Sequence, residues 1–509
     1  MASSRSDPLE TYQGPWDEKA AAHLLNRTGF SATIKEIEAA LKGSLSGAVR
    51  RCVHYDQLAA AWPKPEWAHP ESAPENLKTM GMAEREAMKR DHRKQEREWA
   101  GELQYGWLRR MAQTPRPLEE KLTLFWHGHF ATSFQKVKRA YLMWLQNETL
   151  RRNASGNFKT MVIEVSRDPA MVIWLDNLSN RKRKPNENYA RELMELFTLG
   201  EGNGYTEEDI KEAARAFTGW GLANEKQDFY FNPNQHDLKE KLFMGKRGNW
   251  DGVDIIEIIF KKPECARFIA EKLWAYFAYE QPEPEIVQGL AMLLRQSDYE
   301  LKPLLTRIFS CNAFYSDRAV HTQIKSPVQL VVGAYQLLQK ELPANDSLSL
   351  VLRNGLRLMG QELLLPPDVD GWDGGMAWVN TSSLFLRYNF ASYLVHGVPP
   401  SNTTGKVGGK ATQKAGHKKQ PRGLGSEVVA VEKLVDPAQV TSSENLVRQL
   451  ARILWNSPPD EESLGEFTRF LDTDESGAAS PFKATDPGAA GKIRSLIHLM
   501  MSTPQFQLC

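Results

Sequence analysis

The sequence predicts a mainly α fold, with one large multi-helix unit, irregular loops and little or no sheet. Apolar residues recur at steps of three and four along most of the chain, and the alternating runs typical of strands are scarce. Helix start signals accompany these stripes. Ser326 and Pro327 combine a cap with a first-turn proline, and Thr206 to Asp209 follows the capping-box pattern with Asp in place of Glu. Both signals favour helix.

The stripes, caps and charge runs locate individual helices. The run 83–99 is charged nearly all round, which is typical of a solvated helix carrying ion pairs. Gly200 is an expected helix stop, and Gly219 to Gly221 marks another. Helices are expected over 83–99, over 185–200, from Thr206, after Pro263, from Pro327, over 443–455 and over 493–501, and the segment 120–133 is either helical throughout or broken near Gly128.

Composition places the chain among ordinary globular proteins. Its 509 residues are 41% hydrophobic and 25% charged, with a formal net charge of +1, so collagen, wholesale disorder and a membrane bundle are excluded. No overall field would draw the chain to nucleic acid, so we expect no specific nucleic-acid binding. We expect no transmembrane segment, and we expect a cytoplasmic protein because residues 1–16 lack the apolar run of a secretory signal.

The first candidate site is the pair His127 and His129. On a continuous helix these residues point in nearly opposite directions, so a two-histidine chelate requires a break in the helix at Gly128. Two converging neutral imidazoles would be good ligands for a divalent transition metal. The alternative is that His129 is a core histidine and His127 a surface one.

The second candidate is the segment 185–200. On a helix, Asn188, Arg191, Glu192 and Glu195 share one polar arc opposite an apolar stripe. Two carboxylates one turn apart can ligate a metal or divide acid and base roles. The alternative is an ordinary ion pair between Arg191 and Glu195.

Two weaker candidates follow. His236 stands beside Asp237 in a turn-rich stretch, where the histidine could ligate a metal or act as a base. Trp372 lies in an acidic, glycine-rich loop, 366–375, whose spacing does not match a calcium-binding loop, so it is either a tight turn or a substrate contact. The sequence has no P-loop, no dinucleotide fingerprint and no nucleophile elbow, which disfavours nucleotide-driven and α/β-hydrolase chemistry.

These segments resemble the large bacterial family called domain of unknown function 1800. The resemblance rests on motifs in the family's order, including 21–33, 121–133, 186–220, 266–274, 324–333 and 371–390. It implies a mostly helical single unit and adds weight to the two polar motifs. It also implies a partner, because family members often accompany a sulfatase-like protein, and it marks 64–98 and 399–430 as insertions.

Taken together, these observations predict an organisation and two functional hypotheses. The expected parts are a polar tail over 1–15, a helical core over 16–396 with a charged insertion near 64–98, a flexible basic linker over 397–430 and a small helical segment over 431–509 packed on the core.

The leading hypothesis is a metal-assisted hydrolase or oxidoreductase. His127, His129 and Glu192 would hold the metal. The catalytic residues would be Glu192, Glu195, His236 and Asp237, and the substrate-binding residues would be Asn188, Arg191 and Trp372. The alternative is a non-catalytic scaffold or binding protein in which the same residues form a buried structural network.

Overall fold

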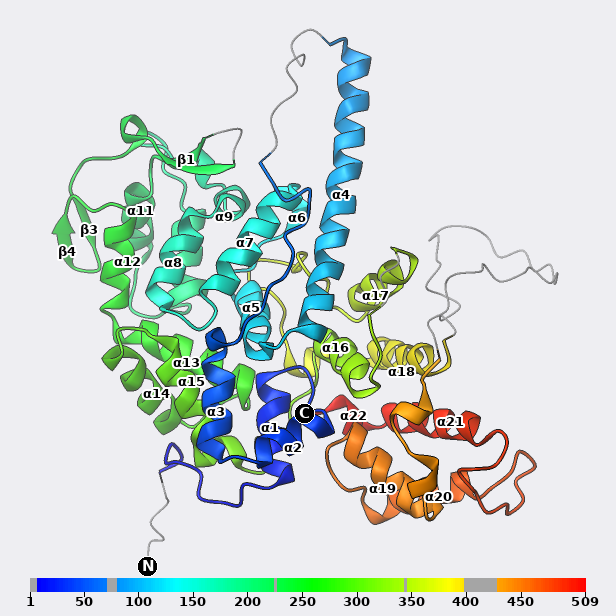
Figure 1. Cartoon of the computed structure of the whole chain (residues 1–509). Coiled ribbons are helices and arrows are strands. Elements are labelled where there is room, and N and C mark those ends of the chain that lie inside the picture. Colours follow the sequence, from blue (N-terminus) through cyan, green and yellow to red (C-terminus); the bar gives the residue numbers. More distant parts are fainter. Residues whose placement is uncertain (1–6, 71–79, 224–226, 343–345, 398–427) are drawn as a thin grey trace, which may run out of the picture. The chain divides into compact units, whose positions relative to one another are not determined.

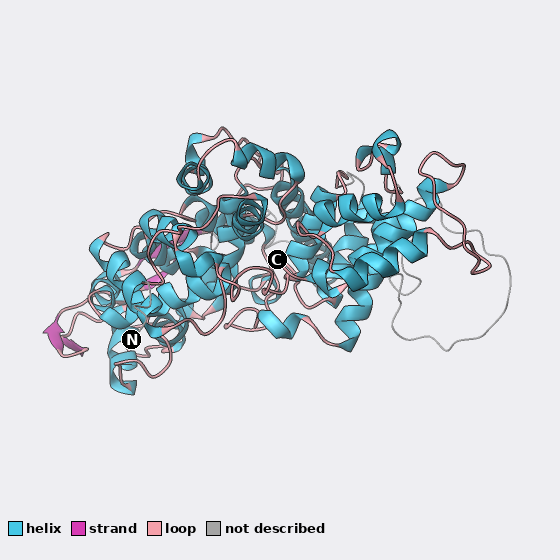
Figure 2. Ribbon diagram, turned by 90° about the horizontal axis from the view of Figure 1, so that it is seen from below, coloured by secondary structure: helices cyan, strands magenta, loops and turns pink. Residues whose placement is uncertain are grey.

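The computed structural model describes residues 7–70, 80–223, 227–342, 346–397 and 428–509. In these ranges the chain is mostly helical, and strands occur only in two two-stranded antiparallel sheets (Figures 1 and 2). The mainly α fold with little sheet is thus confirmed. No helix in the described ranges is both long and apolar enough to span a membrane.

The chain divides into two compact units, each assembled from segments that are far apart in sequence. Unit 1 comprises Met1–Gly14, Ser46–Ala319 and Leu363–Asp373, and unit 2 comprises Pro15–Leu45, Val320–Glu362 and Gly374–Cys509. These units cross the boundaries that the sequence suggested, because residues 16–45 and 431–509 belong to the same unit. Most of the predicted basic linker, residues 398–427, lies outside the described residues.

Unit 1 contains most of the helices. They are α3 (Leu45–Val53), η1 (Tyr55–Gln57), α4 (Met82–Gln113), α5 (Pro117–His129), α6 (Phe134–Val137), α7 (Ala140–Arg152), α8 (Phe158–Arg167), α9 (Pro169–Trp174), η2 (Asn177–Ser179), α10 (Asn188–Glu192), η3 (Leu193–Thr198), α11 (Glu207–Ala216), η5 (Pro233–Gln235), α12 (Gly252–Phe260), α13 (Pro263–Phe277), α14 (Pro284–Gln296), α15 (Leu301–Ser310) and η6 (Asn312–Tyr315).

Both small sheets lie between α11 and α12 in the sequence. Strand β1 (Trp220–Ala223) pairs antiparallel with β2 (Asp228–Phe231), with Trp220 opposite Phe231. Strand β3 (Lys241–Phe243) pairs antiparallel with β4 (Lys246–Gly248). The helix stop expected at Gly219 is therefore followed by a short hairpin, which the sequence did not reveal.

The charged run 83–99 forms the first half of α4, which extends past α5, α6 and α7 (Figure 1). Residues 82–95 are largely exposed, as predicted for a solvated helix. Burial begins at Glu96, whose carboxylate forms an ion pair with Arg139, 3.0 Å from its Nε, and accepts a hydrogen bond from the Ala140 backbone N–H at 2.6 Å. The helix becomes part of the core only where this charge is paired.

Unit 2 is also helical. Its elements are α1 (Glu18–Thr28), α2 (Ile34–Leu41), α16 (Pro327–Leu337), α17 (Asp346–Leu358), η7 (Gly375–Trp378), α18 (Thr381–His396), η8 (Val431–Lys433), η9 (Pro437–Gln439), α19 (Ser443–Leu454), α20 (Glu461–Leu471), α21 (Ala489–Met501) and α22 (Pro504–Gln507).

The start signals identified in the sequence do open helices. Ser326 caps α16 by accepting from the Gln329 N–H, and Pro327 occupies the first helical position. Thr206 and Asp209 form both hydrogen bonds of a capping box at the start of α11. Side-chain caps satisfy backbone N–H groups that have no partner inside the helix, which is why such short motifs locate a helix start.

Candidate functional site

The end of α5 carries the two histidines of the first predicted site. The helix continues through Gly128 to His129, so the break needed for a chelate of the two residues does not occur. Residues two positions apart on a helix are separated by about 200° around its axis. The two imidazoles therefore have different surroundings, and both are buried, which corrects the alternative that placed His127 at the surface.

His127 serves as a hydrogen-bond acceptor in the core of unit 1. Its Nε2 accepts from the backbone N–H of Leu364 at 3.1 Å, so the ring is neutral with its proton on Nδ1. Trp107 and Trp372 contact the ring edge to face, with centroids 5.6 and 5.5 Å away. Burial lowers the pKa of His127 to about 4. His127 thus anchors a loop.

His129 lies in a cage of aromatic rings. Its Nε2 donates to the carbonyl of Phe197 at 3.0 Å, while its Nδ1 is buried and has no hydrogen-bond partner in the described structure. Burial holds the pKa of His129 well below its usual value, and the positive charge of Lys272 lowers it further. The surrounding rings belong to Phe125, Trp126, Phe130, Phe158, Phe197 and Phe268.

The segment Leu363–Asp373 packs against this end of α5. Gly371 has a φ of +89°, and a side chain at this position would collide with the carbonyl oxygen of Gly128. Only glycine permits so close an approach in this conformation. The adjacent Trp372 is half-buried, and a Cβ at Gly128 would lie 3.6 Å from its ring. The acidic, glycine-rich loop is therefore a docked segment of unit 1, and it brings Asp370 to the site.

The second predicted motif is not one regular helix. Helix α10 ends at Glu192 and continues as the π-helix η3, in which the Leu199 N–H bonds the carbonyl of Met194 at 3.0 Å. The extra residue in this turn rotates the following side chains relative to an α-helix, so Met194 is buried and Leu196 is half-buried. Such π-turns occur frequently at functional sites. Of the apolar stripe expected in this segment, Tyr189, Leu193 and Phe197 are buried and only Leu196 is half-buried.

Arg191 forms the ion pair that was the alternative interpretation of this motif. Its guanidinium bonds Glu195 at 3.1 Å, Glu187 at 3.3 Å and Glu207 at 2.7 Å, and these partners raise its pKa. Asn188 is exposed at the start of α10, and its backbone N–H bonds the side chain of Asn186. Arg191 is thus already occupied by carboxylates of its own chain.

Glu192 differs from its neighbours. Its side chain is half-buried, and the carboxyl makes no hydrogen bond with any described residue. Desolvation, followed by repulsion from Glu195 and Asp370, raises the pKa of Glu192 to about 7. This carboxyl is therefore half-protonated at neutral pH.

Lys272 on α13 is a second cation of this region, besides Arg191. It is half-buried, and its ammonium lies 4.8 Å from the centroid of the Phe268 ring. Within the described residues, no carboxylate lies within 4.0 Å of this ammonium. Burial lowers its pKa, and the more distant charge of Asp370 partly offsets this. We call Glu192, Glu195, Lys272 and Asp370 the Glu192 cluster.

His236 and Asp237 are buried elsewhere in unit 1. The Nδ1 of His236 donates to the carbonyl of Thr218 at 2.8 Å, and Asp237 accepts from the Arg215 Nε at 2.8 Å. Neither side chain is among the groups that act on the Glu192 carboxyl. Their contacts hold the segment between the two sheets to α11.

The metal hypothesis gains no support from this geometry. Across the described ranges, no three His, Cys, Asp or Glu side chains form a group able to hold a metal ion. His127 uses its Nε2 for Leu364, and His129 uses its Nε2 for Phe197. A site built on these nitrogens would first have to break both hydrogen bonds.

The structure thus brings together only part of the predicted set. Asp370 acts on the Glu192 carboxyl together with Glu195, and it also acts on Lys272; neither Asp370 nor Lys272 was among the residues predicted from the sequence. Lys272 lies in the family-like segment 266–274, and Asp370 lies in the loop 366–375. The sequence identified both segments but did not predict that they are close in the fold.

Comparison with known proteins identifies the family alone. The model of a protein family of unknown function, DUF1800, matches residues 23–508, so the chain belongs to that family. No curated protein and no solved structure matches the chain.

Proposed function

We propose that this member of a family of unknown function is a hydrolytic enzyme in which Glu192 transfers a proton. One observation carries the proposal: a half-buried carboxyl with no hydrogen bond to the described residues lies near the carboxylates of Glu195 and Asp370, and Asp370 in turn acts on the half-buried Lys272. Structural carboxylates in a protein interior are normally paired. An unpaired one points to a role with a bound molecule.

The chemistry follows from the protonation of Glu192. A carboxyl with a pKa of about 7 exists in both forms at neutral pH, so it can accept a proton from water or donate one to a leaving group. The carboxylates of Glu195 and Asp370 favour its protonated form by repulsion. Acid–base sites typically contain neighbouring titratable groups whose environments give them different pKa values.

Lys272 and Trp372 supply the other requirements. The Lys272 ammonium is not neutralised by a close carboxylate, so it can stabilise negative charge that develops on a substrate oxygen. Trp372, half-buried beside the end of α5, offers an apolar surface for the substrate. The two helices and the docked loop would hold these groups in fixed positions.

Hydrolysis is favoured over oxidation because it needs only what these side chains supply. Proton transfer and charge stabilisation account for the attack of water on an ester, amide or glycosidic bond. The proposal does not depend on a metal. If a metal participates, the carboxylates of the Glu192 cluster offer harder donors than the two engaged histidines.

A second candidate is a structural scaffold, which one observation favours. His127, His129, Arg191, His236 and Asp237 all bond groups of their own chain. In that case the polar motifs stabilise unit 1 and have no substrate. Glu192 separates the two candidates, since a scaffold gives no reason to leave this carboxyl unpaired.

The direct test is a carboxyl titration by NMR. Protein labelled with ¹³C at the glutamate carboxyls is titrated, and Glu192→Gln assigns the signal that disappears. We expect a midpoint near 7 for Glu192, while the exposed Glu201, assigned by Glu201→Gln, serves as the control. A Glu192 midpoint at the ordinary value for glutamate, about 4.3, would refute the proposal.

Activity is tested on a panel of chromogenic esters, amides, phosphoesters and glycosides. We expect hydrolysis of at least one class, with Glu192→Gln reducing kcat by about a hundred-fold or more and Glu201→Gln leaving it unchanged. Equal turnover by the wild type and Glu192→Gln would favour the scaffold, as would a complete lack of turnover combined with an ordinary Glu192 titration.

A further inference from the structure

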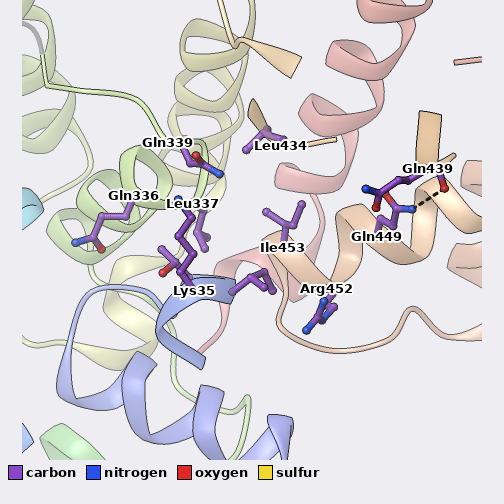
Figure 3. Close-up of a pocket in the computed structure, with 11 residues that line it drawn as sticks. Lys35, Gln336, Leu337, Gln339, Leu434, Gln439, Gln449, Arg452 and Ile453 are labelled. Atoms are coloured by element: carbon purple, nitrogen blue, oxygen red, sulfur yellow. Dashed lines mark hydrogen bonds between the residues drawn. The ribbon is translucent and has the colours of Figure 1, made fainter. Parts of the chain in front are cut away.

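Unit 2 contains a cavity with a volume of about 550 Å³ that is separate from the Glu192 cluster (Figure 3). Its lining comes from the start of α2, the end of α16, the segment around η8 and η9, and α19. All of these segments belong to unit 2. The volume is in the range typical of sites for small ligands.

Part of the lining is aliphatic. Ile34, Leu337, Leu434 and Ile453 contribute apolar side chains from four different segments, and Figure 3 shows Leu337, Leu434 and Ile453 around the same space. No aromatic ring is among the described residues that line the cavity. The apolar part therefore suits a branched aliphatic group better than a sugar ring, which aromatic faces usually bind.

Three of the four glutamines that line the cavity, Gln339, Gln439 and Gln449, use their side chains in a similar way, whereas the amide oxygen of Gln336 accepts from the Ser31 hydroxyl at 2.9 Å. The side-chain N–H₂ of Gln339 donates to the Lys433 carbonyl at 3.1 Å, and that of Gln449 donates to Asn445 at 2.9 Å. The N–H₂ of Gln439 donates to Asp436 at 3.2 Å. Their amide oxygens accept no hydrogen bond from the described residues. The cavity thus presents acceptors, which require N–H or O–H donors on a ligand.

The charges at the cavity are unequal. Arg452 is neutralised, since its guanidinium bonds Glu18 and lies 3.5 Å from Glu38. Lys35 is exposed and has neither an ion pair nor a hydrogen bond with the described residues. Figure 3 shows the Lys35 side chain beside Leu337. The cavity therefore carries one uncompensated positive charge.

We propose that this cavity binds the C-terminal end of a short peptide with aliphatic side chains. The terminal carboxylate pairs with Lys35, the backbone N–H groups donate to the glutamine oxygens, and an aliphatic side chain contacts the apolar lining. A peptide end carries all three features at a spacing of a few ångströms, and a free carboxylate distinguishes it from the interior of a protein chain.

The test uses a fluorescein-labelled pentapeptide, Gly-Ser-Ala-Leu-Leu, with either a free C-terminal carboxylate or a C-terminal amide. Fluorescence polarisation measures binding of both to the full chain. We expect the acid to bind about three- to five-fold more tightly than the amide, as for one exposed ion pair. Lys35→Gln should remove this preference.

Two variants and one competitor complete the design. Lys42 is an exposed lysine that directly follows α2, and the control variant Lys42→Gln should keep the preference for the acid. Gln439→Trp places a bulky ring at an exposed lining position and should weaken binding of both peptides at least about ten-fold.

Three results would overturn the assignment. They are equal binding of acid and amide by the wild type, no binding in the millimolar range, and displacement of the peptide by an N-acetylated chitotriose. The last would show that the cavity binds carbohydrate. Circular dichroism and the thermal midpoint of each variant establish that the chain remains folded.

Discussion

Two carboxyl groups of unit 1, Glu120 on α5 and Glu192 at the end of α10, are held in opposite ways. Glu120 is fully buried, accepts hydrogen bonds from Arg151 and from the Trp107 indole, each at 2.8 Å, and forms an ion pair with Arg110 at 2.6 Å. Glu192 is less buried and has no such donor in the described structure. Burial alone therefore does not distinguish a structural from a functional carboxyl, whereas the donors around it do.

The difference has a physical basis. Burying a carboxylate is costly unless hydrogen bonds and opposite charges replace its water, and the Glu120 network does this. Around Glu192, desolvation together with repulsion from Glu195 and Asp370 outweighs the attraction of Arg191, so the protonated form is favoured instead. The first arrangement keeps a charge permanently, and the second allows the charge to change with pH.

The largest expected effect comes from breaking the Glu120 network. Glu120→Gln leaves the buried Arg151 and the half-buried Arg110 without their shared carboxylate, so we expect a loss of about 3–5 kcal/mol in the free energy of unfolding. Urea unfolding followed by tryptophan fluorescence measures it. Glu148, a more exposed member of the same network, provides the matched control, and Glu148→Gln should cost about 1 kcal/mol or less. Equal losses for the two variants would contradict the comparison.

A smaller and pH-dependent effect is expected at His127. His127→Leu leaves the buried Leu364 N–H without an acceptor, which costs about 1–3 kcal/mol at neutral pH. The wild type, however, loses stability in acid, because the unfolded chain protonates this histidine near pH 6.5 while the folded chain does so only near 4.

The two stabilities should therefore converge as the pH falls. Over that interval the wild type loses up to about 3 kcal/mol from this group, and the variant does not. Urea unfolding at a series of pH values between these limits gives the result. His69→Gln, at an exposed histidine, should leave the slope unchanged. A constant gap between wild type and His127→Leu would show that His127 is not held neutral.

Much of the fold could be predicted from local sequence, because helix starts and stops are encoded over a few residues. Thr206 with Asp209, and Ser326 with Pro327, begin helices as expected. Gly200 follows the π-helix with a φ of +85°, the left-handed conformation that favours glycine at a helix end.

The candidate site could be predicted only in part, because it depends on contacts between distant segments. The position of Asp370 near both Glu192 and Lys272 is set by the packing of a loop, and no spacing in the sequence encodes it. The π-turn after Glu192 likewise has no simple sequence signal. The sequence identified the polar motif at 185–200. It did not predict which of the polar residues in this motif would have no hydrogen-bond partner.

The smallest effect concerns Glu192 itself and has the opposite sign to that of His127. The unfolded chain releases this proton near pH 4.5 and the folded chain only near 7, so the folded state binds more protons between these values and loses stability as the pH rises. Because Glu192 is only partly buried, solvent screening reduces the full effect to about 1–2 kcal/mol. Glu192→Gln, which cannot ionise, should be more stable than the wild type by this amount at pH 8 and equal to it near pH 4. Glu201→Gln should show no such difference, and urea unfolding at the two pH values measures both variants. If Glu192→Gln is less stable at pH 8, the carboxylate is stabilised by donors as Glu120 is, and the distinction between the two groups does not hold.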